Sequence, residues 1–459
     1  MFPREVIPRL LPVVLGVLAL ATPAAAVEVL TTGKHAVLRS KGGFLAVVAD
    51  PVLASVDNPC AGSTPPRLIL SSYPQATLRV VTHVEVALPC AHWTRTRGGW
   101  RYDGKSPGDA VERLVLSPRK LHIRFGGDGW KAPSGPVGYL QAWLETGERR
   151  LLVRFHDFRV NRDTLLVARK PSSQAAAGEA AFWDVLLGDD RSESRQQACI
   201  AALTKAARQG RRDGRSRFLL AMIHLYRFGQ LVTDYASASP AAVAELAAAV
   251  DAFEAATPLL WDHRTRVGDS RVPGFAAAAK YGLGRVRGDS ALEAAGLAEL
   301  EAAVDINPFF NLFDLLPVAQ AVPPTDPQFA IVMSRVTPYL DDPETIACVG
   351  TQPEICANSG LAPRNVEGAL TLFGDLFVKA SATARSSAER DTLLARAQQW
   401  YTLAAGFAAA RPGYRFQAAL DERIANIAAR AAAYATLDPS DDPPIIGAAT
   451  EACAACHNR

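Results

Sequence analysis

The sequence predicts a multidomain β + α protein: an N-terminal all-β sandwich or barrel, then an irregular α-solenoid and a short C-terminal tail. Three observations lead to this prediction. Short segments rich in β-branched and aromatic residues, bounded by Gly, Pro, Asn or Asp, recur over residues 27–170. Apolar residues spaced three and four apart dominate residues 179–437. A chain of 459 residues also exceeds what one hydrophobic core usually organises.

Residues 1–26 have the features of a secretory signal peptide. Arg4 and Arg9 supply positive charge, an apolar stretch follows from Leu10 to Ala21, and three alanines at 24–26 form a small-residue cleavage site. The apolar stretch is short for a membrane span, so an uncleaved anchor is the less favoured alternative. We therefore expect an exported, periplasmic protein of the Gram-negative type, with no transmembrane segment in the mature chain.

The β-domain is expected to contain several short strands at the spacing of a sandwich or barrel. Strand-like segments occur at residues 35–39, 44–48, 67–70, 77–88, 120–125 and 151–155. Residues 99–106 also match the phosphate-loop pattern of nucleotide-binding enzymes. That motif needs a helix starting at its Lys, but Pro107 and Gly108 follow at once. We therefore predict a hairpin here and no ATP binding.

A linker is expected at residues 171–178, before the helical domain begins. The best-defined helix pair has Leu-x-x-Phe-Gly-x-x-Phe at residues 370–377 and Ala-x-x-x-Tyr-x-x-Ala at residues 397–404, with a capping box at residues 386–389 between them. This pattern resembles a tetratricopeptide repeat, in which small residues let paired helices pack closely.

The helix pairs do not recur at a constant spacing, which indicates an irregular solenoid rather than a regular array. The resemblance implies a concave surface suited to a protein partner. An irregular helical domain with no groove function is the alternative.

Five of the seven cysteines lie outside the C-terminal tail. In an oxidising compartment, Cys60 with Cys90 and Cys348 with Cys356 are candidate disulfides, each contributing about 2–4 kcal/mol if formed. Cys199 is then left over on an apolar helix face, where a buried, unreactive thiol is the expectation.

The most specific motif stands in the C-terminal segment 438–459, which we expect to be a linker and a haem-attachment tail. It reads Cys453-Ala-Ala-Cys456-His457. Two thiols at this spacing, followed directly by His, form the attachment pattern of a c-type haem. A redox Cys pair would need a thioredoxin-like context, and a zinc site would need four ligands.

The tail resembles the haem-binding motif of the c-type cytochromes. The resemblance implies one covalent haem c, with Cys453 and Cys456 as thioether links and His457 as the proximal ligand of the haem iron. Two residues follow His457, so we expect any distal ligand to come from upstream or from a partner. His263 is the first candidate, and Met222 and Met333 are the others, although core packing is the alternative for both methionines.

The sequence therefore predicts an exported monohaem c-type cytochrome-like protein. It would serve electron transfer or haem-dependent docking of a redox or assembly partner through its helical body. The alternative is a periplasmic protein-binding or assembly scaffold in which the haem is auxiliary or absent. A haem peroxidase is a weaker alternative, because no acid–base cluster or nucleophile motif is recognisable, and we expect a redox carrier rather than an enzyme. A net charge of +3 gives no indication of nucleic-acid binding.

Overall fold

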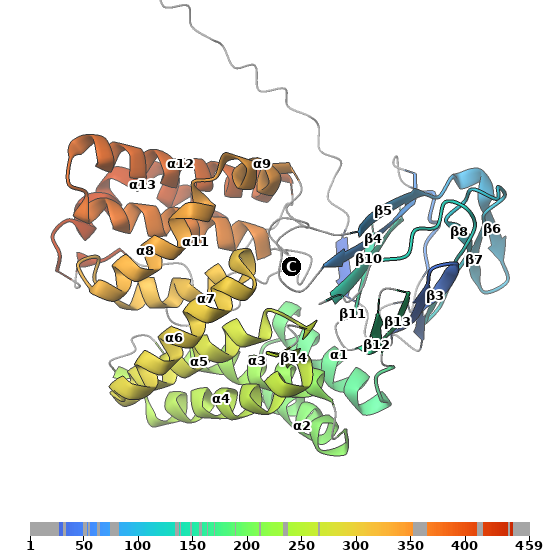
Figure 1. The fold of residues 1–459 in the computed structure, drawn as a ribbon, viewed down its shortest axis with the longest axis horizontal. Coiled ribbons are helices and arrows are strands. Elements are labelled where there is room, and N and C mark those ends of the chain that lie inside the picture. Colours follow the sequence, from blue (N-terminus) through green and yellow to red (C-terminus); the bar gives the residue numbers. More distant parts are fainter. Residues whose placement is uncertain are drawn as a thin grey trace, which may run out of the picture.

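A computed structural model describes most of the chain. The described residues are 27–30, 34–48, 53, 56–61, 65–73, 82–133, 137, 139–146, 149–155, 158–162, 164–168, 170–188, 190–210, 213–232, 237–264, 267–351, 365–410, 416–438 and 441–443. Within them, two β-sheets are followed by a region of 12 α-helices (Figure 1). The predicted order of a β region followed by an α region is therefore confirmed.

The β region consists of a five-stranded and an eight-stranded sheet. The five-stranded sheet has the order β1 (Val27–Leu30), β11 (Arg149–Phe155), β10 (Tyr139–Thr146), β4 (Arg67–Tyr73) and β5 (Thr82–Ala87). The eight-stranded sheet has the order β12 (Phe158–Arg162), β13 (Leu165–Ala168), β2 (Lys34–Arg39), β3 (Gly42–Val48), β9 (Lys120–Phe125), β8 (Val111–Ser117), β7 (Gly99–Asp103) and β6 (Trp93–Thr96). Neighbouring strands are antiparallel, except that β1 runs parallel to β11.

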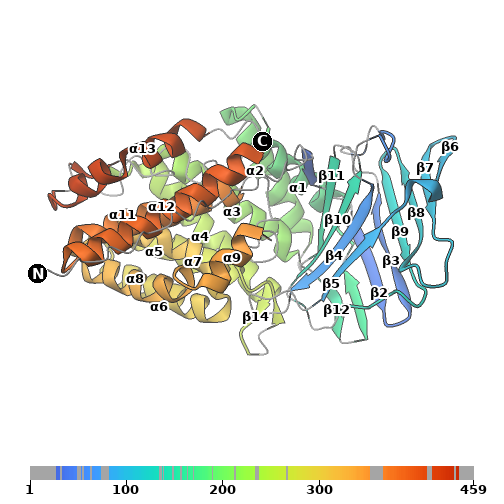
Figure 2. The same ribbon diagram turned by 90° about the horizontal axis from the view of Figure 1, so that it is seen from above.

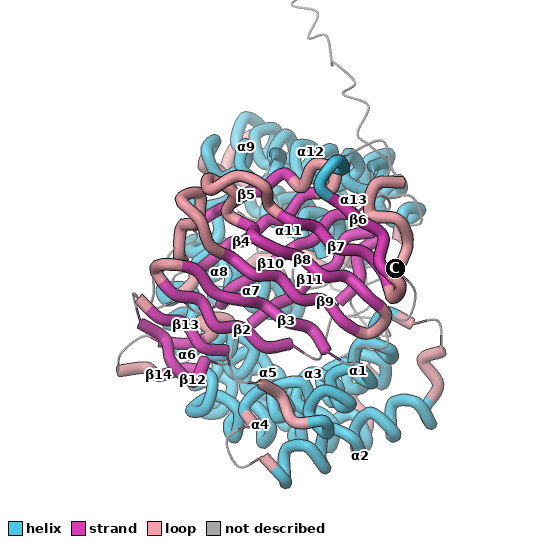
Figure 3. The backbone as a smooth tube through the Cα atoms, turned by 90° about the vertical axis from the view of Figure 1, so that its right-hand side faces the viewer, coloured by secondary structure: helices cyan, strands magenta, loops and turns pink. Residues whose placement is uncertain are grey.

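The two sheets share one hydrophobic core. Because side chains alternate along a strand, one face of each sheet is apolar. Leu38 and Ile123 of the larger sheet lie in the same buried cluster as Leu68 and Leu140 of the smaller one. The sheets therefore pack face to face. The eight-stranded sheet is the layer farther from the helices, and no described α-helix covers its outer face (Figures 2 and 3).

Residues 99–106, which match the phosphate-loop pattern, begin within a β-sheet. Their first residues are strand β7, which pairs with β6 on one side and β8 on the other. The backbone N–H groups of Lys105 and Ser106 both donate to the Asp109 carboxylate, at 2.8 and 2.9 Å. The predicted hairpin is confirmed, and these donors are already satisfied by an acidic side chain.

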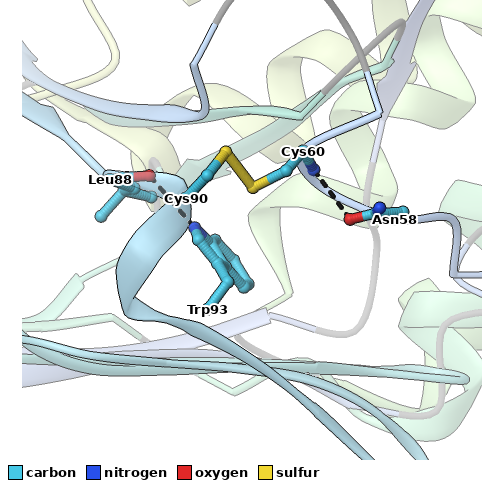
Figure 4. The surroundings of a disulfide bond; sticks show 5 residues. All are labelled: Asn58, Cys60, Leu88, Cys90 and Trp93. Atoms are coloured by element: carbon cyan, nitrogen blue, oxygen red, sulfur yellow. Dashed lines mark hydrogen bonds between the residues drawn. A yellow bond between two sulfur atoms is a disulfide. The ribbon is translucent and has the colours of Figure 1, made fainter.

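One predicted disulfide is present. Cys60 and Cys90 are bonded (Figure 4), and Cys90 follows three residues after the end of β5, which pairs with β4. The Trp93 indole N–H donates to the Leu88 carbonyl next to it, at 3.1 Å. Cys348 is also disulfide-bonded, whereas its predicted partner Cys356 lies outside the described residues.

Cys199 is the thiol that stays free within the described chain, and it is buried as predicted. Burial raises its pKa to about 12, with a further contribution from Asp184, so the thiol is protonated and unreactive.

Helices follow one another along the rest of the chain. Their bounds are α1 (Ser173–Leu187), α2 (Glu193–Gln209), α3 (Gly214–Leu231), α4 (Pro240–Leu260), α5 (Val272–Arg287), α6 (Ser290–Ile306), α7 (Pro308–Ala321), α8 (Pro327–Leu340), α9 (Pro343–Thr351), α11 (Asn365–Ala380), α12 (Ser387–Ala410) and α13 (Gln417–Tyr434). Most contacts join consecutive helices, and α7 also contacts α5 and α11. A short hairpin of β14 (Trp261–Asp262) and β15 (Val267–Gly268) separates α4 from α5.

The prediction of a linker at residues 171–178 is wrong for most of that segment. Helix α1 begins at Ser173, within that segment, because the Ser172 side chain accepts a hydrogen bond from the Ala175 N–H and caps the helix. The alanines that follow have high helix propensity, which the prediction of a linker did not take into account.

The helix pair predicted around residues 366–404 is confirmed as α11 and α12. Ser386 accepts a hydrogen bond from the Glu389 N–H at 3.1 Å, as a capping box requires, and the Glu389 carboxylate accepts from the Arg385 N–H at 2.7 Å. Gly374 lets the two helices approach, since a Cβ at this position would overlap the ring of Tyr401.

A buried ion cluster connects the β region to the helices. The Glu179 carboxylate of α1 is only 4% exposed and lies 3.2 Å from Lys34 of β2 and 3.1 Å from Arg215 of α3. Burial by itself would raise the pKa of Glu179, but the two cations outweigh it and hold the pKa below its ordinary value. Glu179 is therefore ionised and ties one sheet to two helices.

Candidate functional site

The haem-attachment residues predicted from the sequence, Cys453, Cys456 and His457, lie outside the described residues, the last of which is 443. The described chain therefore bears on this site in two ways. It fixes where the C-terminal segment leaves the helical region, and it shows the geometry of each residue proposed as a distal ligand.

The start of the C-terminal segment is held on α11. The Asp442 carboxylate lies 3.9 Å from the ammonium of Lys379, a residue that is 2% exposed. The Lys379 ammonium also lies 5.9 Å from the ring centre of Phe329 and 5.5 Å from that of Tyr434. Burial lowers the pKa of Lys379, and Asp442 opposes this effect. Asp442 therefore supplies a negative charge to a buried cation.

His263, the first candidate for the distal ligand, is exposed on the β14–β15 hairpin rather than at a helix end. Its Nδ1 accepts a hydrogen bond from the Trp261 indole N–H at 3.2 Å. An accepting Nδ1 carries the lone pair, so the proton of the neutral ring is on Nε2. In this arrangement Nε2 has no lone pair to offer to iron.

Met222 and Met333 pack against hydrophobic cores. Met222 of α3 lies against the core of the first helices, and Met333 of α8 lies against the core of the later ones. Both side chains are half-buried. This packing corresponds to the alternative role that the sequence suggested for them.

His224 of α3 was not among the predicted ligands, but its surroundings are the most specific of the described histidines. Its Nδ1 lies 2.7 Å from a carboxylate oxygen of Glu245 on α4. The other oxygen of Glu245 accepts from the Arg227 Nε at 2.6 Å. A second nitrogen of Arg227 donates to Glu193 at 2.7 Å, which links α2 to the group.

This arrangement fixes the tautomer of His224. An ionised carboxylate only accepts hydrogen bonds, so Nδ1 must carry the proton. In the neutral ring Nε2 then holds the free lone pair. Metal-binding histidines in proteins commonly have this second-shell carboxylate. Sequence spacing did not point to the pair, because His224 and Glu245 are 21 residues apart on different helices.

The outer face of the eight-stranded sheet carries a second distinctive group. The Phe44 ring lies 5.3 Å from the ring centre of His35 and 5.8 Å from that of His122. Five exposed cations lie on strands of the same sheet: Arg39, Arg101, Arg113, Lys120 and Arg124. Burial lowers the pKa of both histidines, and neighbouring Lys and Arg charges lower it further.

Asp103 and Glu112 pair with three of these arginines, so cations outnumber anions on this face, which we call the cationic sheet face.

Across the described ranges, no group of three or more His, Cys, Asp or Glu side chains is placed to hold a metal ion. The same part of the chain contains no helix with both the length and the apolar character needed to cross a bilayer. Comparisons with protein families, with curated proteins and with solved structures found no match to this chain.

Proposed function

We propose that the protein is an exported monohaem c-type cytochrome-like protein that exchanges electrons with a docked partner. The observation that carries this proposal is the motif Cys453-Ala-Ala-Cys456-His457. Cys453 and Cys456 would bind the haem vinyl groups and His457 would be the proximal ligand. When bound, the haem supplies an iron that changes reversibly by one electron.

The chemistry of the donor set fits such a group. The described chain adds to the motif a histidine, His224, whose Nδ1 proton is fixed and whose Nε2 is free to coordinate. Neutral imidazole is a ligand that haem iron accepts readily.

Export of the chain is supported by its cysteine chemistry. The Cys60–Cys90 disulfide and the disulfide-bonded state of Cys348 are typical of an oxidising compartment. The signal-peptide features of residues 1–26 favour the same location, and attachment of c-type haem takes place on the exported side of the membrane. We propose the periplasm as the working compartment.

In this proposal the two folded regions present the haem to a partner. The helical region is an irregular solenoid of stacked helix pairs, of which α11 and α12 are the most repeat-like. The β region is a sandwich joined to it through Glu179. The redox or assembly partner would dock on the helical region, because the C-terminal segment starts there, at Asp442.

A second candidate function is a periplasmic protein-binding or assembly scaffold with the haem auxiliary or absent. The cationic sheet face favours this scaffold function, since half-buried aromatic rings on the same face as exposed Arg and Lys side chains suit an acidic partner.

The deciding experiment is expression with a haem-attachment system, followed by a pyridine haemochrome spectrum and intact mass. We expect one covalent haem per chain, lost in the double variant Cys453→Ala and Cys456→Ala. The matched control, Cys199→Ala, removes a thiol that is buried in a helical core and should keep the haem. A matured protein without a Soret band, or a native Cys453–Cys456 disulfide, would refute the proposal.

Redox behaviour then separates the candidate functions. A haem that cycles between ferric and ferrous states, with partner binding that depends on the helical region, supports electron transfer. Partner binding that persists in the double cysteine variant supports the scaffold. A five-coordinate haem that responds to peroxide supports the peroxidase alternative.

A further inference from the structure

We propose that Asp314 of α7 carries a proton in the folded protein and that this proton holds α7 on α5, so that the contact between the two helices weakens as the pH rises. Helix α5 is shared by two hydrophobic cores. Ala279 and Leu283 lie in the core of the first helices, and Ala277 and Tyr281 lie in the core of the later ones. Helix α7 contacts α5 directly. A proton bound here therefore acts at the junction of the two cores, whether or not the chain carries a haem.

Two buried oxygen atoms of α7 lack a hydrogen-bond donor. They are Oδ2 of Asp314 and Oδ1 of Asn311, and neither has a partner among the described residues. The two residues are three apart on the helix, so their side chains lie on the same face. Asn311 is 0% exposed and Asp314 is 6% exposed. Buried acceptors are normally paired in folded proteins, so a donor is expected at this place.

The side-chain amide of Asn311 cannot supply the missing donor. Its Nδ2 donates to the Ser270 carbonyl at 3.0 Å and to the Ala303 carbonyl at 2.6 Å. These two bonds use both amide hydrogens. Turning the amide over would place Oδ1 against two carbonyl oxygens, so its orientation is fixed. Oδ1 of Asn311 is therefore an acceptor that needs a donor from elsewhere.

The packing of α5 leaves no room for a water molecule in front of the two oxygens. A Cβ at Gly274 of α5 would overlap both Oδ2 of Asp314 and Oδ1 of Asn311. The space between Gly274 and these atoms is thus smaller than a methyl group, whereas a buried water needs its own volume and two or more polar partners. The remaining donor is Asp314 itself. When protonated, its carboxyl group can donate to Oδ1 of Asn311.

The charge of the neighbouring cation is already balanced. Arg271, just before α5, is the described charge that acts on Asp314. Its guanidinium binds both carboxylate oxygens of Asp269, with Nε 2.6 Å from Oδ1. An ionised Asp314 would be a second buried anion beside a cation that is already paired. Burial accordingly raises the pKa of Asp314 well above its ordinary value, and Arg271 opposes this effect without cancelling it.

The other helices packed on α7 do not change this balance. The buried residues of α6 and α8 are uncharged. Helix α11 has three buried charged residues: Glu367, Asp375 and Lys379. Asp375 is bonded to Arg423, and Lys379 lies beside Asp442. Negative charge on Glu367 would favour the neutral form of Asp314, since like charges disfavour ionisation.

A definite pH dependence follows. The unfolded chain loses the Asp314 proton above about pH 4, whereas the folded chain retains it. The proton therefore contributes its full stability below that pH. Above it, the unfolding equilibrium constant rises about tenfold per pH unit on account of this group, until Asp314 ionises in the folded chain as well.

The test is Asp314→Asn, which keeps the shape of the side chain and offers an N–H donor at every pH. Urea unfolding of the full-length protein is measured from about pH 4 upward. We expect the ratio of the unfolding equilibrium constants, wild type over Asp314→Asn, to grow about tenfold per pH unit. The matched control is Asp375→Asn, an acid of similar burial that is bonded to Arg423. This control should be less stable than the wild type at neutral pH.

Infrared difference spectroscopy gives a second readout. At neutral pH the wild type should show the carbonyl stretch of a protonated carboxylic acid, and Asp314→Asn should lack it. A stability ratio that is constant or falls with pH overturns the proposal, and so does the absence of this difference band. A variant that fails to fold also counts against the proposal, because a neutral amide should replace a neutral acid of the same shape.

Discussion

The close contact between Gly374 of α11 and Tyr401 of α12 gives a quantitative test of how the helical region is packed. A Cβ at 374 would overlap the Tyr401 ring. Tyr401 is fully buried, and its hydroxyl donates to the Asp375 carboxylate at 2.6 Å. The same carboxylate accepts from Arg423 of α13 at 2.8 and 3.0 Å. Gly374→Ala must therefore displace either the ring or the helix.

The matched control is Gly406→Ala in α12, where a Cβ would meet nothing within 4 Å. Both substitutions replace a mid-helix glycine and gain about 0.5–1 kcal/mol of backbone entropy and helix propensity. Only Gly374→Ala overpacks a core, which costs about 1–3 kcal/mol. Since the propensity gain cancels, the two variants should differ by about 1–3 kcal/mol in the free energy of unfolding, with Gly406→Ala above the wild type.

The measurement is urea unfolding followed by helical circular dichroism, with tryptophan fluorescence as a second probe because Trp400 lies beside Tyr401. If the two alanine variants unfold at the same urea concentration, or if Gly374→Ala is the more stable, the close α11–α12 packing described above is wrong.

Three further predictions concern buried charge and the disulfide. A carboxyl whose pKa is lower in the folded chain stabilises the fold at pH values above its unfolded-state pKa, and this stabilisation is lost as the pH falls. Glu179→Gln should therefore flatten the loss of stability below about pH 4.5, measured as the melting temperature against pH. Asp375→Ala should cost about 3–5 kcal/mol in urea unfolding, because the buried Arg423 guanidinium loses the Asp375 carboxylate, and an equally stable variant would contradict that pairing. Replacing Cys60 and Cys90 by Ala should cost about 2–4 kcal/mol, measured as a lower unfolding midpoint of the β region that the reduced wild type reproduces.

The sequence identified elements whose signals are local. Strands β2, β3, β4, β9 and β11 contain the segments predicted as strands, because β-branched residues alternate between turn formers there. Helices α11 and α12 were recognisable from a cap and from a glycine that faces an aromatic residue. Strand β10 was missed although Gly138 and Gly147 flank it, since Tyr139–Thr146 mixes polar and apolar residues and contains a single β-branched residue.

Contacts between distant segments left no comparable signal. The sequence around Glu179, a charged residue in an alanine-rich stretch, predicts a surface position. In the structure Glu179 is buried between Lys34, which is 145 residues away, and Arg215. The contrast between His224 and His263 depends on their partners: the Glu245 carboxylate accepts from Nδ1 of His224, whereas the Trp261 indole donates to Nδ1 of His263. A neighbouring aromatic made His263 look favourable, but hydrogen-bond direction cannot be obtained from composition or spacing.

The pairing of Asp442 with Lys379 has a consequence for binding strength. Any group carried at residue 453 stays within about 40 Å of this point, the length of eleven extended residues. One molecule confined to that volume has an effective concentration on the order of millimolar. A contact too weak to form between separate molecules would thus be well populated within this chain, and releasing Asp442 would dilute it.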